Sequence, residues 1–170
     1  MPSWRPMQPR TRARWRRSRR VHGRGDNRPV IFESSIDISA PAPAVWSIME
    51  RLEQWPDWAP TFRSVQRVRS PAGVGAAYRV EQPRLPPSIM TVTRWEPGRG
   101  FTWASRSAML GARGEHDIEP MGANACRVHL ALRFEGLFAP VAGRLMRRMV
   151  AAYVDSEATA LKRRAEGPSA

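Results

Sequence analysis

The sequence predicts an α+β domain in which an antiparallel sheet of about seven strands is covered by one long C-terminal helix. Three features lead to this prediction: short segments of alternating apolar and polar residues, turn residues between them, and one long amphipathic segment near the end. Alternation with a period of two is typical of strands that bury one face, and such a sheet needs a cover. With 170 residues, the chain is long enough to build one core of this kind.

The first strand is predicted at Phe32–Ile38, where the even positions are mostly apolar and the odd positions are polar. The prolines of Ala40–Pro43 end this strand and suit a first helical turn, so a short helix is predicted at Ala44–Leu52. The segment Trp55–Pro60 is expected to form a rigid turn or a second short helix. Three tryptophans of this region could line a cavity mouth or touch a membrane interface, but we favour packing that closes one end of the sheet: Trp46, Trp55 and Trp58.

Six further strands are predicted, each bounded by turns that contain glycine or proline. They are expected at residues 62–69, 76–81, 89–96, 101–107, 112–119 and 126–135. A long helix is then predicted at Pro140–Arg164. At 100° per residue, its apolar side comprises Ala142, Leu145, Met146, Met149, Ala152, Tyr153 and Ala160.

The net charge of +13 resides mainly in the first 28 residues, which hold ten arginines and the single acid Asp26. The remaining residues hold 28 − 10 = 18 basic and 15 − 1 = 14 acidic side chains, which is only +4. Residues 1–28 contain almost no aliphatic side chains, so we predict a disordered tail before a folded domain at 29–165, with a disordered C-terminus at 166–170. The tail could be inert or precede the true start, or it could bind nucleic acid or another polyanion. A targeting role is disfavoured because no apolar stretch follows Arg19 and Arg20.

Several function classes find no support in the sequence. No segment approaches the roughly 20 apolar residues of a membrane helix. A single cysteine, Cys126, excludes an internal disulfide and indicates a reducing, cytoplasmic location. Three scattered histidines offer no metal-ligand spacing, and no glycine-rich phosphate loop is present, so no metal or cofactor is expected. The oligomeric state is left open.

Five segments of the chain resemble one known group of proteins: Ile38–Trp46, Trp55–Pro60, Arg94–Pro97, Gly114–Pro120 and Phe134–Gly136. In order and spacing they are similar to the SRPBCC superfamily, which includes START-like lipid-transfer domains, polyketide cyclases and dehydratases, and the birch-pollen-allergen fold. The resemblance covers roughly residues 30–165. It implies a helix-grip fold, in which a curved sheet wraps around the last helix and leaves an internal cavity. It implies no particular reaction, because one scaffold hosts carriers, sensors and enzymes.

If such a cavity exists, the alternation of the strands names the side chains that face it. Such a wall is mostly apolar and aromatic with few polar atoms, as small-molecule pockets usually are, although the same residues could simply pack together as a core. The candidate ligand-binding residues are Tyr78, Val80, Phe101, Trp103, Ser105, His116, Ile118, Leu130, Leu132 and Phe134, with Met149, Ala152 and Tyr153 from the helix.

His116 is the most informative polar candidate, because a partly buried imidazole titrates near neutrality and serves as acid or base. The alternative is a core histidine that is hydrogen-bonded to a neighbour. Its sequence neighbours Glu115 and Asp117 are expected to point to solvent, as is His129, so the sequence shows no catalytic dyad.

Three functions therefore remain open. The first is a non-enzymatic binder or carrier of an apolar molecule such as a lipid, an isoprenoid or an aromatic polyketide. The second is a polyketide cyclase or dehydratase in which His116 or Tyr78 moves protons. The third is binding of nucleic acid through the arginine-rich tail.

Overall fold

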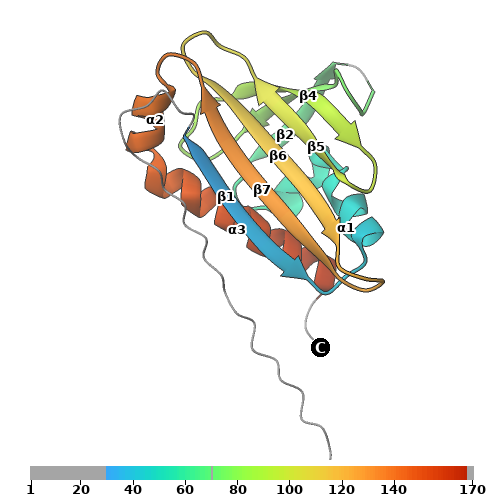
Figure 1. Cartoon of the computed structure of the whole chain (residues 1–170). Helices are drawn as coiled ribbons and strands as arrows, with labels where there is room; N and C mark the ends of the chain where they lie inside the picture. Colours follow the sequence, from blue (N-terminus) through green and yellow to red (C-terminus); the bar gives the residue numbers. More distant parts are fainter. Residues whose placement is uncertain (1–29, 70, 168–170) are drawn as a thin grey trace, which may run out of the picture.

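The computed structural model describes residues 30–69 and 71–167, in which an antiparallel sheet curves around a long helix (Figure 1). The seven strands lie in the order β1-β7-β6-β5-β4-β3-β2, and every neighbouring pair is antiparallel. The predicted α+β class and the helix-grip arrangement are confirmed. The strands are β1 (Ile31–Ile38), β2 (Ser64–Arg69), β3 (Ala77–Glu81), β4 (Ser88–Glu96), β5 (Gly100–Ser105), β6 (Gly111–Pro120) and β7 (Cys126–Glu135).

Two short helices lie between β1 and β2, as predicted, at one end of the sheet. They are α1 (Ala42–Met49) and the 3-10 helix η1 (Leu52–Asp57). Trp46 packs edge-on against Trp95 of β4, with ring centroids 5.1 Å apart. Trp55 is fully buried, and its indole Nε1 donates a hydrogen bond of 3.0 Å to the Met49 carbonyl, which ties η1 to α1. Both side chains therefore close this end of the sheet.

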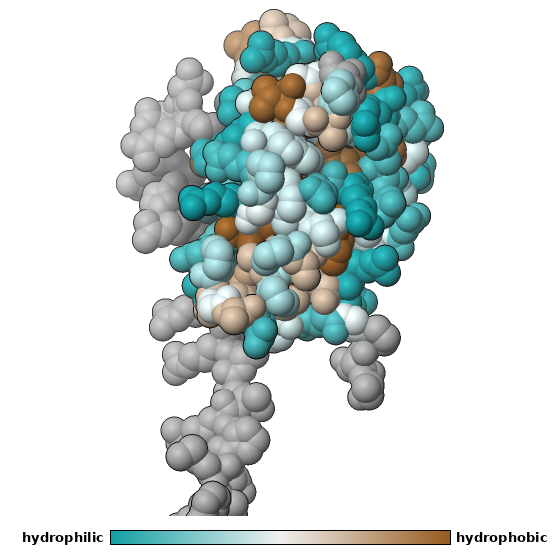
Figure 2. Space-filling view, turned by 90° about the vertical axis from the view of Figure 1, so that its right-hand side faces the viewer, coloured by the Kyte–Doolittle hydropathy of each residue, from teal (hydrophilic) through white to brown (hydrophobic). Residues whose placement is uncertain are grey.

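The outer face of the sheet carries ion pairs between strands. Three join neighbouring strands, namely Arg113–Glu135, Arg127–Asp37 and Arg133–Glu115, and the fourth, Arg94–Asp117, spans β5 from β4 to β6. Glu115 and Asp117 thus point away from the core, as predicted. His129 also lies on this face, where it contacts Ser35 and Glu119. The side of the molecule turned toward the viewer in Figure 2 is mostly hydrophilic or intermediate, with small, separated hydrophobic groups.

The predicted single helix at Pro140–Arg164 is in fact two helices, α2 (Ala139–Leu145) and α3 (Arg147–Glu166). The chain changes direction at Met146, whose ψ of 2° is far from the helical value near −42°. α2 lies beside Val30, the residue before β1, and a Cβ at Gly143 would come within 2.6 Å of the Cβ of Val30. Glycine is therefore needed at this close approach.

This break also changes which side of the helix is buried. The buried residues of α3 are Val150, Val154, Ala158, Ala160 and Leu161, of which only Ala160 belongs to the predicted apolar side. By contrast, Leu145 is 85% exposed and Ala152 is exposed, so their predicted inward positions are wrong. The prediction failed because it assumed one continuous helix through Met146. The two helices have different axes, so their residues do not share one apolar side.

α3 continues through Glu166, whose carboxylate accepts hydrogen bonds from the Ser39 backbone N–H at 2.7 Å and from Lys162 at 2.5 Å. Burial raises the pKa of Glu166, but the bonds from Lys162 and Ser39 outweigh it, so the net shift is downward. The end of α3 is thereby fixed to the chain beyond β1. The predicted disordered tail at 1–28 and the last residues, 168–170, lie outside the described residues.

Candidate functional site

The inner face of the sheet is closed at one end and partly open at the other. Near α1 and η1, Ile38, Phe101 and Val128 have no exposed surface. Near α2, Leu132 of β7 and Met149 of α3 are half-buried. Leu132 differs in this respect from Leu130, which lies on the same face and is buried. Part of the inner surface is therefore accessible toward the α2 end.

The closed end is filled by a cluster of aromatic rings around Trp55. Its ring centroid lies 5.4 Å from Trp103, 5.9 Å from Phe101 and 5.1 Å from His116. Phe62 packs against the same indole at 5.1 Å. The space beside Trp103 is thus occupied by a side chain from η1, in agreement with the expected packing role of Trp55.

His116 lies inside this cluster, on the predicted inner face. Its ring stacks on Phe101 with centroids 4.4 Å apart and planes only 6° from parallel. Its Nε2 lies 2.9 Å from Oε1 of Glu157 on α3, and the two side chains are 6% and 13% exposed. With Glu157 as a carboxylate, Nε2 donates, since a carboxylate oxygen only accepts. Nδ1 is buried and has no hydrogen-bond partner among the described residues.

Glu157 was missed by sequence reasoning, although one signal was available. It follows Met149 and Tyr153 at intervals of eight and four residues, which places it on the same side of a helix. An acid among apolar residues on that side indicates a buried partner, and the fold provides one in His116. The link joins residues 41 positions apart.

A second polar group lies on the inner face at the β2–β3 edge. Tyr78 is 1% exposed, and burial raises the pKa of its hydroxyl despite the opposing influence of the nearby Arg67 guanidinium. Arg67 lies opposite Tyr78 in the register, 5.7 Å from the ring centroid, and pairs with Glu53 of η1 at 2.5 Å. Tyr78 therefore remains protonated and able to donate at neutral pH.

The Tyr153 hydroxyl, also on α3, donates to the carbonyl of Pro83 in the β3–β4 loop. This bond links α3 to the opposite edge of the sheet. Tyr153 therefore forms one border of the partly open region.

Most of the predicted wall residues do come together on the inner face. Eight are buried: Tyr78, Val80, Phe101, Trp103, His116, Ile118, Leu130 and Phe134. Four are half-buried toward the α2 end: Ser105, Leu132, Met149 and Tyr153. Ala152 is not part of this wall. The Ser105 hydroxyl accepts a hydrogen bond of 3.1 Å from the Ala112 backbone N–H.

Two hollows in residues 30–69 and 71–167 lie beside this wall, and each shares with it at most one residue, Ser105. One borders α2 at Pro140, Val141, Arg144 and Leu145, and the other borders the β5–β6 loop from Ser105 to Gly111 with Arg113 and Glu135. No group of three or more potential metal ligands lies together within these ranges. No helix there is both long and apolar enough to cross a membrane.

Comparison with protein families identifies the group to which this arrangement belongs. The family described as polyketide cyclase / dehydrase and lipid transport matches residues 29–166. The chain belongs to this family. The match includes every strand and helix of the structure, so the polyketide cyclase / dehydrase and lipid transport family accounts for the whole described fold. No curated protein matches the chain.

Solved structures show the same fold at low sequence identity. A START superfamily protein from Mycobacterium smegmatis aligns with a TM-score of 0.66 at 18% identity, over 80% of this chain and 97% of that one. The Zhui aromatase/cyclase from Streptomyces sp. R1128 gives 0.64 at 18%, over 82% and 94%. Norcoclaurine synthase from Thalictrum flavum gives 0.65 at 11%, over 88% and 96%. One fold thus serves proteins with different names and reactions, and these likenesses specify no ligand.

Proposed function

We propose that this protein binds and carries an apolar small molecule, such as a lipid, an isoprenoid or an aromatic polyketide, on the inner face of the sheet at the α2 end. The observation that carries the proposal is the difference in burial along that face. The α1 end is sealed by Trp55, whereas Leu132, Met149 and Tyr153 keep part of their surface accessible. A ligand there would meet apolar side chains from the sheet and from α3.

Physical chemistry supports useful affinity at such a surface without a charged contact. Burial of apolar surface contributes about 25 cal/mol per Å². The inner face also offers a polar group that could orient a ligand, namely the Tyr78 hydroxyl. A reduced, buried Cys126 is compatible with the cytoplasmic location that we propose for this carrier.

The proposal is tested by filling the inner surface with one added ring. Ala112 of β6 lies opposite Phe134 and is half-buried on the inner face, whereas Ala131 of β7 lies opposite Glu115 and is half-buried on the outer face. Ala112→Phe should therefore weaken binding of an apolar naphthalene fluorophore at least tenfold. Ala131→Phe is the matched control and should bind like the wild type.

Native mass spectrometry of the three purified proteins provides the second measurement. An apolar molecule that co-purifies with the wild type and with A131F, but not with A112F, would agree with the proposal. Equal probe binding by A112F and A131F would place the ligand elsewhere and reject the inner face as the site. Thermal unfolding of both variants checks that they remain folded.

A second candidate, a polyketide cyclase or dehydratase, is favoured by the buried pair of His116 and Glu157. A carboxylate that orients an imidazole and stabilises its charged form is a common arrangement for general acid–base catalysis. In such an enzyme His116 would exchange the proton with the substrate, and Tyr78 would donate to a carbonyl oxygen. H116Q should then abolish conversion of a poly-β-ketone thioester with little loss of probe binding. Unchanged turnover by H116Q would exclude His116 as the acid or base, and a wild type that converts no thioester would eliminate this candidate and leave the carrier.

A further inference from the structure

Large hydrophobic side chains are concentrated on the surface around α2. Within residues 30–69 and 71–167, six of the ten exposed large hydrophobic residues lie there, and we call these six the α2 apolar patch: Met109, Leu110, Leu137, Phe138, Val141 and Leu145. Leu145 and Leu137 are the most exposed, at 85% and 72%. Leaving such side chains in water is unfavourable, so a contiguous group of them indicates a binding surface.

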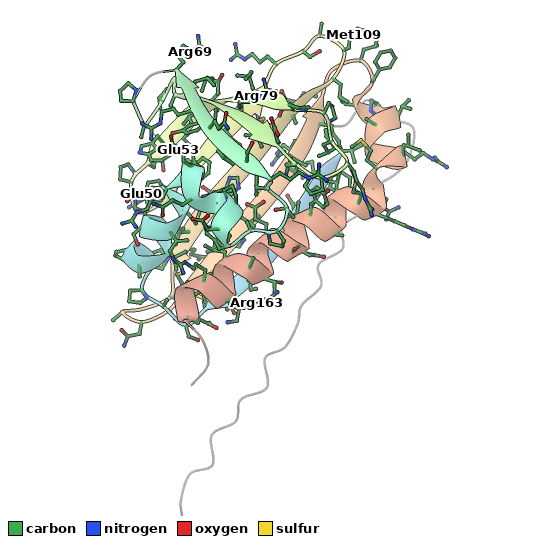
Figure 3. The ribbon with its side chains drawn as sticks, turned by 180° about the vertical axis from the view of Figure 1, so that it is seen from behind. Glu50, Glu53, Arg69, Arg79, Met109 and Arg163 are labelled. Atoms are coloured by element: carbon green, nitrogen blue, oxygen red, sulfur yellow. The ribbon has the colours of Figure 1, made fainter. Side chains whose placement is uncertain are left out.

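The two segments that form the patch are joined by backbone hydrogen bonds. The Phe138 N–H donates to the Met109 carbonyl at 2.8 Å, and the Leu137 N–H donates to the Ala108 carbonyl at 3.3 Å. Gly136 permits this approach, because it has a φ of 103° and a Cβ there would lie 2.9 Å from the Met109 oxygen. Figure 3 shows Met109 beside the α2 end of the molecule, whereas Arg163 lies at the other end of α3. The patch is therefore built into the fold.

Positive charge surrounds the patch without compensating acids. Arg144, Arg147 and Arg148 follow one another here, and residues 136–154 contain no Asp or Glu. None of these three arginines pairs with a carboxylate in the part of the chain that the structure describes. Arg147 and Arg148 also occupy the first turn of α3, where the helix dipole disfavours cations. An anionic partner would relieve this repulsion.

We infer that the α2 apolar patch and its arginines dock on an anionic lipid surface. Aliphatic side chains gain from insertion at the boundary of headgroups and acyl chains, and nearby arginines gain from anionic headgroups. Nucleic acid would satisfy the arginines, but it offers no apolar medium for Leu145, Val141 or Leu137. The inference concerns the outer surface and does not depend on what the inner face binds.

The experiment is sedimentation of the full-length protein with two kinds of vesicle. One kind is pure phosphatidylcholine. The other contains about 30 mol% phosphatidylglycerol, which gives the vesicle surface a negative charge. The wild type should partition at least tenfold more strongly to the anionic vesicles. The triple variant R144Q/R147Q/R148Q should lose roughly fivefold for each arginine removed. The double variant V141S/L145S should lose on the order of tenfold.

Two matched variants control for general effects of charge and hydrophobicity. Arg163 and Arg164 are exposed at the far end of α3, and Val68 and Ile89 are exposed outside the patch. R163Q/R164Q and V68S/I89S should each bind anionic vesicles like the wild type. Urea unfolding verifies that all four variants remain folded.

Three results would overturn the inference. One is equal partitioning of the wild type to both kinds of vesicle or to neither. Another is loss of binding in the arginine variant but not in V141S/L145S, since that would indicate charge attraction alone. The third is tighter binding to 20-base-pair duplex DNA than to anionic vesicles, which would identify nucleic acid as the partner.

Discussion

The buried pair of His116 and Glu157 should be energetically coupled, and a double-mutant cycle measures that coupling. Glu157→Leu leaves Nε2 of His116 without its partner among aromatic rings, and an unsatisfied buried donor costs about 1–3 kcal/mol. His116→Phe keeps a ring to stack on Phe101 but leaves the carboxylate, 13% exposed, without its partner. The double variant removes both polar groups together, so its loss of stability should be smaller than the sum by about 1–2 kcal/mol.

The outer face provides a matched control with the same residue types. Nε2 of His129 lies 3.3 Å from Oε2 of Glu119, but these side chains are 45% and 64% exposed. Because solvent screens exposed pairs, their coupling should lie below about 0.5 kcal/mol. The assay is urea unfolding of wild type, single and double variants of each pair at one pH. Equal coupling in the two pairs would refute the reasoning, since burial would then have no influence on the His116–Glu157 bond.

Three further predictions concern packing, thiol access and pH. Gly114→Ala would place a Cβ 2.5 Å from Nε1 of Trp103, so it should lower stability by about 1–3 kcal/mol and alter the near-ultraviolet circular dichroism; an unchanged spectrum would argue against this contact. The Cys126 thiol is fully buried and burial raises its pKa, so a thiol reagent should react only as fast as the protein unfolds; rapid labelling of the native protein would contradict this. The hydrogen bond from Arg127 lowers the pKa of the Asp37 carboxyl from its ordinary value of 3.8. The stability that this ion pair contributes is therefore present above pH 3.8 and is lost as the pH falls through the pKa of Asp37 in the folded protein. The destabilisation caused by Asp37→Asn at pH 6 should therefore shrink toward pH 3, and a constant difference in urea midpoint would exclude this ion pair as the cause.

The α2 apolar patch and the partly open region of the inner face lie at the same end of the molecule. This arrangement matters for how a carrier could exchange its ligand. Tyr153, bonded to the Pro83 carbonyl, borders the partly open region, and Leu145 protrudes from α2 just before α3 begins. A protein that docks through Leu145 would bring this opening close to the lipid surface. A ligand could then pass between the membrane and the inner face over a short path, which joins the two proposals without making either depend on the other.

Sequence alone was sufficient for the strands, the order of the elements and the face of each strand. Alternation in β6 and β7 is a local property with a period of two, so the inward position of His116 and the outward position of His129 followed from pattern alone. The closing of one end by Trp55 was likewise predictable, because a large aromatic side chain in a short helix after the first strand needs a buried site.

Only the tertiary structure decided the partner of His116, the break at Met146 and the position of the α2 apolar patch. The pairing with Glu157 depends on how α3 crosses β6, and no local period reports a contact 41 residues away. The break accompanies a close approach of Gly143 to Val30, a contact with a distant part of the chain that no helical period reports. Leu145 and Ala152 were placed on the wrong side because a helical wheel assumes one straight axis, whereas α2 and α3 lie on either side of the break at Met146.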